Sequence, residues 1–149
     1  MALKPDRIEA YTDISFFMNT TGVRGGIVVH ATGGSGVSMD DANAVVEYAT
    51  SQSGTKPAGL LLNDVVDLDL TRQHINWHKD EVQKGSKVTL LRQGQVTTNV
   101  ISGTPTIGQD AYYGANGLLT PTNSNSTKVG RFLSTKDSDG YAKVDINIT

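Results

Sequence analysis

The stretch GSKVTLLRQGQVTTNV, residues 85–100, decides the fold. Val88 and Leu90, and then Val96, Thr98 and Val100, stand at every second position, and a period of two is typical of a β-strand with one buried face. The pair Gln93-Gly94 lies between the two halves and is a hairpin-turn candidate, because glycine accepts backbone angles closed to other residues. The stretch therefore predicts two antiparallel strands joined by a tight turn.

The same pattern of short strands and compact turns continues to the C-terminus. Residues 116–117 (NG) lie between two apolar runs and give a strong hairpin signal, because both residues accept positive φ. Residues 138–140 (SDG) form a second predicted turn, and clean alternation follows over residues 141–148. Five or more short strands in about sixty residues predict a small antiparallel β-barrel or sandwich, most regular over about residues 85–149.

Three more strands are predicted nearer the N-terminus. Residues 26–31 are a short apolar run bounded by glycine, as expected of a buried strand, and residues 58–62 are apolar enough for a central strand. Residues 66–70 alternate between apolar and polar side chains, as in a half-buried strand. Residues 26–149 are therefore expected to form a single β-rich domain.

One short helix is predicted over residues 39–50. Ser38 can cap its first turn, acidic residues follow directly, and Val45 and Ala49 recur at helical spacing. Gly54 lies just beyond the predicted end. The fold class is thus mainly β, with a minor α+β character.

Residues 1–25 match neither a helical nor a strand period well. They are predicted to form an extended N-terminal arm, which could end in one short strand. Such an arm either packs on its own domain or reaches a neighbouring subunit.

Composition excludes several classes of function. The 149 residues include no cysteine, which rules out disulfides and thiolate chemistry, and a net charge of −2 provides no electrostatic footprint for nucleic acid. Charges interrupt the first residues where a signal peptide needs an apolar core, and no apolar run is long enough to span a membrane. The chain is therefore expected to be made in the cytoplasm, with no nucleic-acid or membrane partner.

Two histidines give one outline of a metal site. His74 and His78 are four residues apart, with Glu81 three further on, and on a helix they would share a face. Position 75 is Ile, where zinc hydrolases have Glu, and no helical apolar stripe accompanies the pair. Surface or packing roles for the histidines are favoured.

Other outlines of chemistry are equally incomplete. Asp64, Asp67 and Asp69 cluster near the histidines, but alternation places the last two on the solvent side of a strand, without a calcium loop. Residues 33–36 (GGSG) lack the Lys-Ser/Thr ending of a phosphate loop, and Ser35 lacks a Gly-x-Ser-x-Gly frame. No catalytic residue, cofactor site or metal site is predicted, and the protein is not expected to be an enzyme.

The C-terminal pattern resembles a known family. Its strands run in the order Gly85–Val96, Gly108–Tyr112, Lys128–Leu133 and Ala142–Ile146, and they resemble the β-barrel of the decoration (cement) proteins on tailed-phage heads. Lys56 to Gln83 also looks like head proteins of that kind. The resemblance covers roughly residues 56–149.

The resemblance implies a structural virion protein. Such proteins bind the major capsid protein on the outside of the expanded head, often as trimers, and brace the shell. A homo-oligomer, with a trimer favoured, on the capsid exterior is thus expected. Each contact can be weak, because many repeated sites act together.

Four residues are candidate capsid or subunit contacts. Ile14, Phe16 and Phe17 lie in the predicted arm, which would order only when the lattice site is present. Trp77 is the fourth, because aromatic residues are enriched at binding hot spots. An arm of this kind predicts that a chain lacking residues 1–17 still folds but no longer decorates capsids.

Two other interpretations of the sequence remain open. A carbohydrate- or receptor-binding β-module of a phage tail or adhesin would need an exposed aromatic platform. A metal-dependent enzyme would have to use His74, His78 and an aspartate. Binding to a glycan array would favour the first interpretation, and stoichiometric zinc in the purified protein would favour the second.

Overall fold

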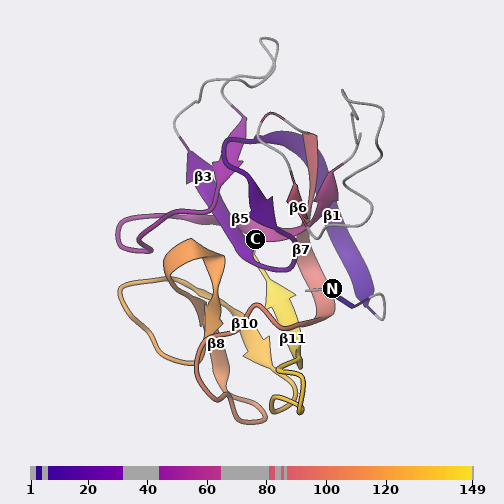
Figure 1. Cartoon of the computed structure of the whole chain (residues 1–149), viewed down its shortest axis with the longest axis vertical. Helices are drawn as coiled ribbons and strands as arrows, with labels where there is room; N and C mark the ends of the chain where they lie inside the picture. Colours follow the sequence, from indigo (N-terminus) through magenta and orange to yellow (C-terminus); the bar gives the residue numbers. More distant parts are fainter. Residues whose placement is uncertain are drawn as a thin grey trace.

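A computed structural model describes residues 3–4, 7–31, 44–64, 81–82, 85 and 87–148. The protein is mainly β, as predicted, with a sandwich-like arrangement (Figure 1). In the described residues the strands are β1 (Ile8–Met18), β2 (Gly22–Val23), β3 (Ile27–Ala31), β4 (Val45–Glu47), β5 (Pro57–Asp64), β6 (Glu81–Val82), β7 (Lys87–Thr98), β8 (Asp110–Tyr113), β9 (Leu119–Thr120), β10 (Lys128–Phe132) and β11 (Ala142–Asn147). No helix in this described part is long and apolar enough to span a membrane.

Strand β7 connects the two halves of the molecule. The large sheet has the order β1-β4-β3-β5-β7-β11-β10-β8-β9, and β1 also pairs with β7. The pairings β1–β4–β3–β5–β7–β1 thus return to their start, which makes a ring of five strands. Figure 1 shows this ring in the upper half and β8, β10 and β11 in the lower half.

Two hydrophobic cores follow from this arrangement. The smaller core receives a side chain from each strand of the ring: Met18, Val28, Val46, Leu61 and Leu90. The larger core lies on the other face of β3 and β5 and contains Ile27, Val29, Leu60 and Leu62, together with side chains of β8, β10 and β11. Strands β3 and β5 are therefore buried on both faces, which explains their continuous apolar sequence.

The predicted hairpin turn at Gln93-Gly94 is wrong. Both residues lie inside β7, which is one strand of 12 residues. Strand β1 approaches Gly94 closely, since a Cβ atom there would lie 2.1 Å from the carbonyl oxygen of Ile8. The pairing of β1 with β7 is irregular beside it, between Glu9 and Tyr11. Glycine here serves a close strand contact rather than a reversal of the chain.

The predicted helix over residues 39–50 is also wrong where the structure describes it. Val45–Glu47 form β4, which pairs with β1 and β3. Val45 and Val46 are both buried, and β-branched side chains suit a pleated sheet better than a helix. Residues 39–43, and the predicted strand over residues 66–70, lie outside the described residues.

The prediction of an extended N-terminal arm over residues 1–25 also differs from the structure, because much of this segment is a paired strand. Ile8–Met18 form β1, whose register with β7 runs from the pair Ile8–Gln95 to the pair Phe17–Lys87. The strand is part of the domain's own sheet. We therefore expect deletion of residues 1–17 to destabilise the domain, and point variants are the better test of contact residues.

Two predicted turns are confirmed. Asn116 and Gly117 have φ of 58° and 75°, and the strands on either side, β8 and β9, are antiparallel. The turn over residues 137–140 joins the antiparallel strands β10 and β11. The Asp137 carboxylate accepts hydrogen bonds from the amides of Asp139 and Tyr141, both at 2.9 Å.

Candidate functional site

Strand β1 carries three exposed large apolar side chains. Ile8 is 59% exposed, Tyr11 is 53% exposed and Ile14 is 54% exposed. Their spacing of three does not fit a regular strand, and the register of β1 with β7 shifts three times along this segment. We call these three residues the β1 row. Apolar side chains gathered on one strand are typical of a protein contact surface.

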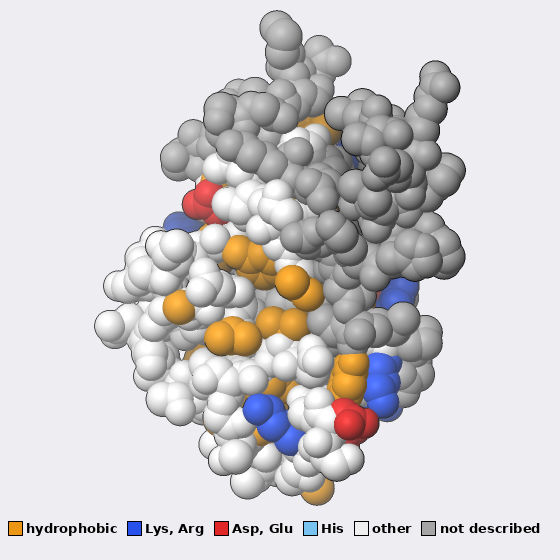
Figure 2. All heavy atoms as spheres, viewed as in Figure 1, with side chains coloured by type: hydrophobic (Ala, Val, Ile, Leu, Met, Phe, Trp, Pro, Cys, Tyr) orange, Lys and Arg blue, Asp and Glu red, His pale blue; other side chains and the backbone are white. Residues whose placement is uncertain are grey.

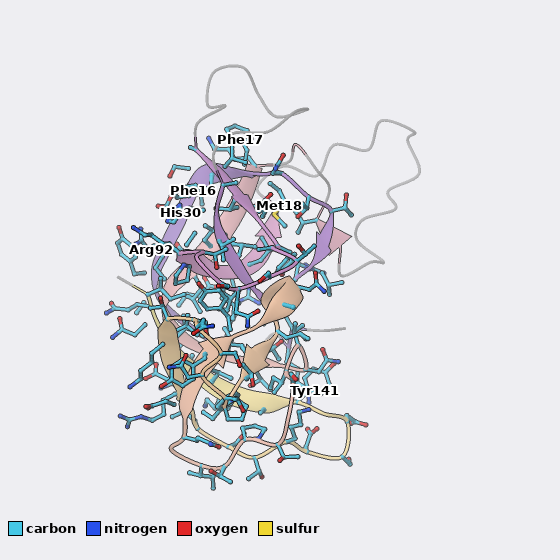
Figure 3. The ribbon with its side chains drawn as sticks, turned by 90° about the vertical axis from the view of Figure 1, so that its left-hand side faces the viewer. Phe16, Phe17, Met18, His30, Arg92 and Tyr141 are labelled. Carbon is cyan, nitrogen blue, oxygen red and sulfur yellow. The ribbon has the colours of Figure 1, made fainter. Side chains whose placement is uncertain are left out.

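The end of β1 that follows the row is fixed in the domain. Phe16 is half-buried against the smaller core, with its ring centroid 5.5 Å from that of His30. Phe17 is only 8% exposed, and the Lys87 ammonium lies 5.7 Å from its ring centroid. Figure 3 shows Phe16, Phe17 and Met18 together in the upper half of the molecule. Phe16 and Phe17 thus pack in their own domain, whereas Ile14 is accessible, and Trp77 lies outside the described residues.

Arg92 of β7 links the middle of β1 to the C-terminal strand. Its Nη1 lies 4.0 Å from Oδ2 of Asp13, and its guanidinium carbon lies 6.0 Å from the Tyr11 ring centroid. Its Nε donates a hydrogen bond of 3.2 Å to the carbonyl oxygen of Ile148. Partial burial acts to raise the pKa of Asp13, but hydrogen bonds from Ser15 and the charge of Arg92 outweigh it and lower that pKa. The carboxylate is therefore ionised at neutral pH.

His30 lies beside this group, as Figure 3 shows. Burial, followed by the charges of Arg92 and Lys56, lowers the pKa of His30 below its usual value of 6.5. The folded state thus favours the neutral imidazole. Protonation of His30 would add a positive charge to those of Arg92 and Lys56 nearby.

This shift predicts a pH dependence of stability. Because the pKa of His30 is lower in the folded state, the unfolded chain binds more protons once the pH falls through 6.5. Wild-type protein is expected to lose stability between neutral pH and about pH 5, and His30→Gln is expected to reduce that loss. Urea unfolding of both proteins across this range measures the difference. Equal pH dependence of the two would contradict the assignment.

An apolar groove lies between the two halves of the molecule. Its volume is about 510 Å³, and it is lined by Thr21, Gly22, Val23, Tyr48, Asn99, Val100, Asn116 and Leu118. Figure 2 shows hydrophobic side chains gathered across the middle of the molecule. Val23 and Leu118 are 45% and 36% exposed, so the groove presents apolar surface to solvent.

Tyr48 is fixed within this groove by a tight slot. Its hydroxyl donates to the carbonyl oxygen of Val23 and accepts the Gly26 amide at 3.3 Å. A Cβ atom at Gly22 or Gly117 would lie 2.2 or 2.4 Å from the Tyr48 ring, so both positions need glycine. Burial raises the pKa of Tyr48, and the hydroxyl stays protonated.

We expect Tyr48→Phe to destabilise the protein by about 1–3 kcal/mol, because it leaves two backbone groups without their partner. Urea unfolding followed by circular dichroism measures the change. Tyr11→Phe is the matched control, since Tyr11 is exposed, and it should change stability by less than about 0.5 kcal/mol. Equal effects at the two positions would contradict the role given to the Tyr48 hydroxyl.

The structure does not describe the side chains that were weighed for metal or acid–base chemistry. His74, His78, Asp67 and Asp69 lie outside the described residues, as do the side chains of Asp64 and Glu81. Within the described ranges there is no group of three His, Asp or Glu side chains that could hold a metal ion.

The described structure is thus a β protein with exposed apolar side chains on β1 and beside the groove. Comparison with family models identifies the family to which the chain belongs. Residues 6–147 match the structural cement protein family (E217 gp24/Pam3 gp6). The match covers nearly the whole chain, so the protein belongs to this family and is a structural cement protein of phages. A comparison with curated proteins gave no match.

Proposed function

We propose that the protein binds the outer surface of the expanded phage capsid, through the major capsid protein, and stabilises the shell. The observation that carries this proposal is the family match, since it spans both halves of the fold. The described surface agrees with such a role, because it offers exposed apolar side chains on a rigid sheet.

The β1 row is the proposed contact with the capsid. Ile8, Tyr11 and Ile14 are more than half exposed, yet the backbone that carries them is paired with β7. A paired strand loses little conformational freedom on binding, so apolar contacts made by the row convert efficiently into affinity. Ile14 was predicted from the sequence, whereas Ile8 and Tyr11 come from the structure.

We further propose that the protein acts as a trimer. Several weak contacts made by one oligomer would then add up on a lattice of repeated sites. Size-exclusion chromatography with light scattering measures the mass directly. A monomer in solution that also fails to assemble on heads would contradict this part of the proposal.

Stabilisation is tested on expanded heads that lack the protein. Adding purified protein is expected to raise the temperature at which the heads release their DNA, because binding to the intact shell favours that state. Unexpanded heads are the control and should bind little protein. An unchanged release temperature with full occupancy would contradict a stabilising role.

A further inference from the structure

A positively charged cleft lies where the two halves of the molecule meet. Its volume is about 340 Å³, and its lining comes from the start of β5, from β7, from β10 and from the end of β11. The lining residues are Lys56, Pro57, Arg92, Thr127, Lys128, Asn147 and Ile148. Three of them are cations and none is acidic, although the whole chain has a net charge of −2.

Two of the three cations in the cleft each have a carboxylate neighbour outside it. Arg92 is oriented by its hydrogen bond to the Ile148 carbonyl oxygen, with Asp13 4.0 Å away on the β1 side. Lys128 lies 3.0 Å from Asp110, and this pair is about half exposed, so solvent weakens it. Burial, followed by the charges of Arg92 and Lys56, lowers the pKa of His30, which agrees with the two cations lying close to that side chain.

The cleft shares one lining residue with a hollow beside the first residue of the β1 row. A second hollow of about 300 Å³ is lined by Ile8 and Ala10 of β1, by Gly94 of β7 and by Asn147. Asn147 lines both hollows, so a bound segment could pass from the apolar row to the cations. Asp145 lines this second hollow and not the cleft, so the acidic residue and the three cations line different hollows.

We propose that this cleft binds an acidic side chain, aspartate or glutamate, on an extended segment of the capsid protein. This inference rests on the proposed function. Arginine and lysine form short, charge-assisted hydrogen bonds with carboxylates, and Pro57 and Ile148 provide apolar surface for the methylene groups beside the carboxylate. Nucleic acid fits less well, because tight binding to a phosphate backbone uses more cations than the cleft offers and is opposed by the negative net charge.

Charge reversal tests the proposal on undecorated expanded heads. Lys56→Glu and Lys128→Glu are each expected to weaken decoration roughly tenfold or more, since each replaces an attraction by a repulsion. Arg92 is left unchanged because it also contacts Asp13 and Ile148. The matched control is Lys143→Glu, an exposed lysine of β11 that does not line the cleft. Urea unfolding should show Lys56→Glu and Lys143→Glu as stable as wild type within about 0.5 kcal/mol, whereas Lys128→Glu should lose about 1 kcal/mol because it replaces the ion pair with Asp110 by a repulsion.

The outcomes separate this inference from the proposed function. If wild-type protein decorates heads and the cleft variants decorate as well as Lys143→Glu, the cleft assignment is overturned while the function stands. If wild-type protein does not bind heads at all, the proposed function itself fails. Wild-type binding to duplex DNA that the two cleft variants lose would assign the cleft to phosphate and would also overturn the inference.

Discussion

The variant Gly130→Ala is expected to prevent stable folding. A Cβ atom at position 130 would lie 1.8 Å from the carbonyl oxygen of Asp145 and 2.9 Å from its carbonyl carbon. Both atoms are backbone of β11, so no side-chain rotation can relieve the clash. Gly130 pairs with Ile146, and the neighbouring Val129 and Phe132 are completely buried. Separating β10 from β11 would therefore open the larger core.

We expect this clash to cost more than about 4 kcal/mol, which is a large share of the stability of an ordinary domain. The variant should be insoluble or should unfold at much lower urea concentration than wild type. Gly114→Ala is the control, since its φ is −118° and the nearest atom to a new Cβ would lie 3.8 Å away. A stable Gly130→Ala protein would contradict the described register of β10 and β11.

A triple variant of the β1 row, with Ile8→Thr, Tyr11→Thr and Ile14→Thr, is expected to fold and to lose decoration. Each side chain is about half exposed, so each can contribute about 1 kcal/mol of further apolar burial at an interface. The sum of about 3 kcal/mol is roughly a hundredfold in affinity for each protomer, and multivalent binding would increase the loss. Threonine keeps the strand propensity of β1. Cosedimentation with undecorated expanded heads measures the occupancy.

The control for the row is Ile107→Thr, because Ile107 is 74% exposed and lies outside the strands. It makes the same chemical change at a different surface and should leave decoration unchanged. Undiminished binding by a correctly folded triple variant would show that β1 does not face the capsid.

The C-terminal fold could be predicted from the sequence because its signals are local. The alternation over residues 141–148 places Ala142, Val144 and Ile146 in the core, and residues 116–117 turn the chain as their type demands. The prediction of a turn at Gln93-Gly94 was wrong because the local sequence does not distinguish a glycine needed for a close contact between strands from a glycine needed for a turn. A short apolar segment such as Val45-Val46 is compatible with either a helix or a strand. Its pairing with β1 and β3 makes it a strand here.

The surface was less predictable than the fold. Ile14 was identified from its apolar character, but the register shifts that leave Ile8 and Tyr11 exposed with it leave no signal in the sequence. The cleft residues Lys56, Arg92 and Lys128 are separated by more than thirty positions each, and only the sheet order brings them together. Composition favoured a non-enzymatic protein, and the family match agrees with a structural role.

Electron cryomicroscopy of expanded heads mixed with purified protein tests the central claim most directly. We expect added density on the outer surface at repeated lattice positions, with β1 facing the shell and the cleft over an extended segment of the capsid protein. The same heads without added protein should lack this density. Saturating protein that leaves the outer surface bare, or that binds only to the inner surface or to the tail, would contradict the account.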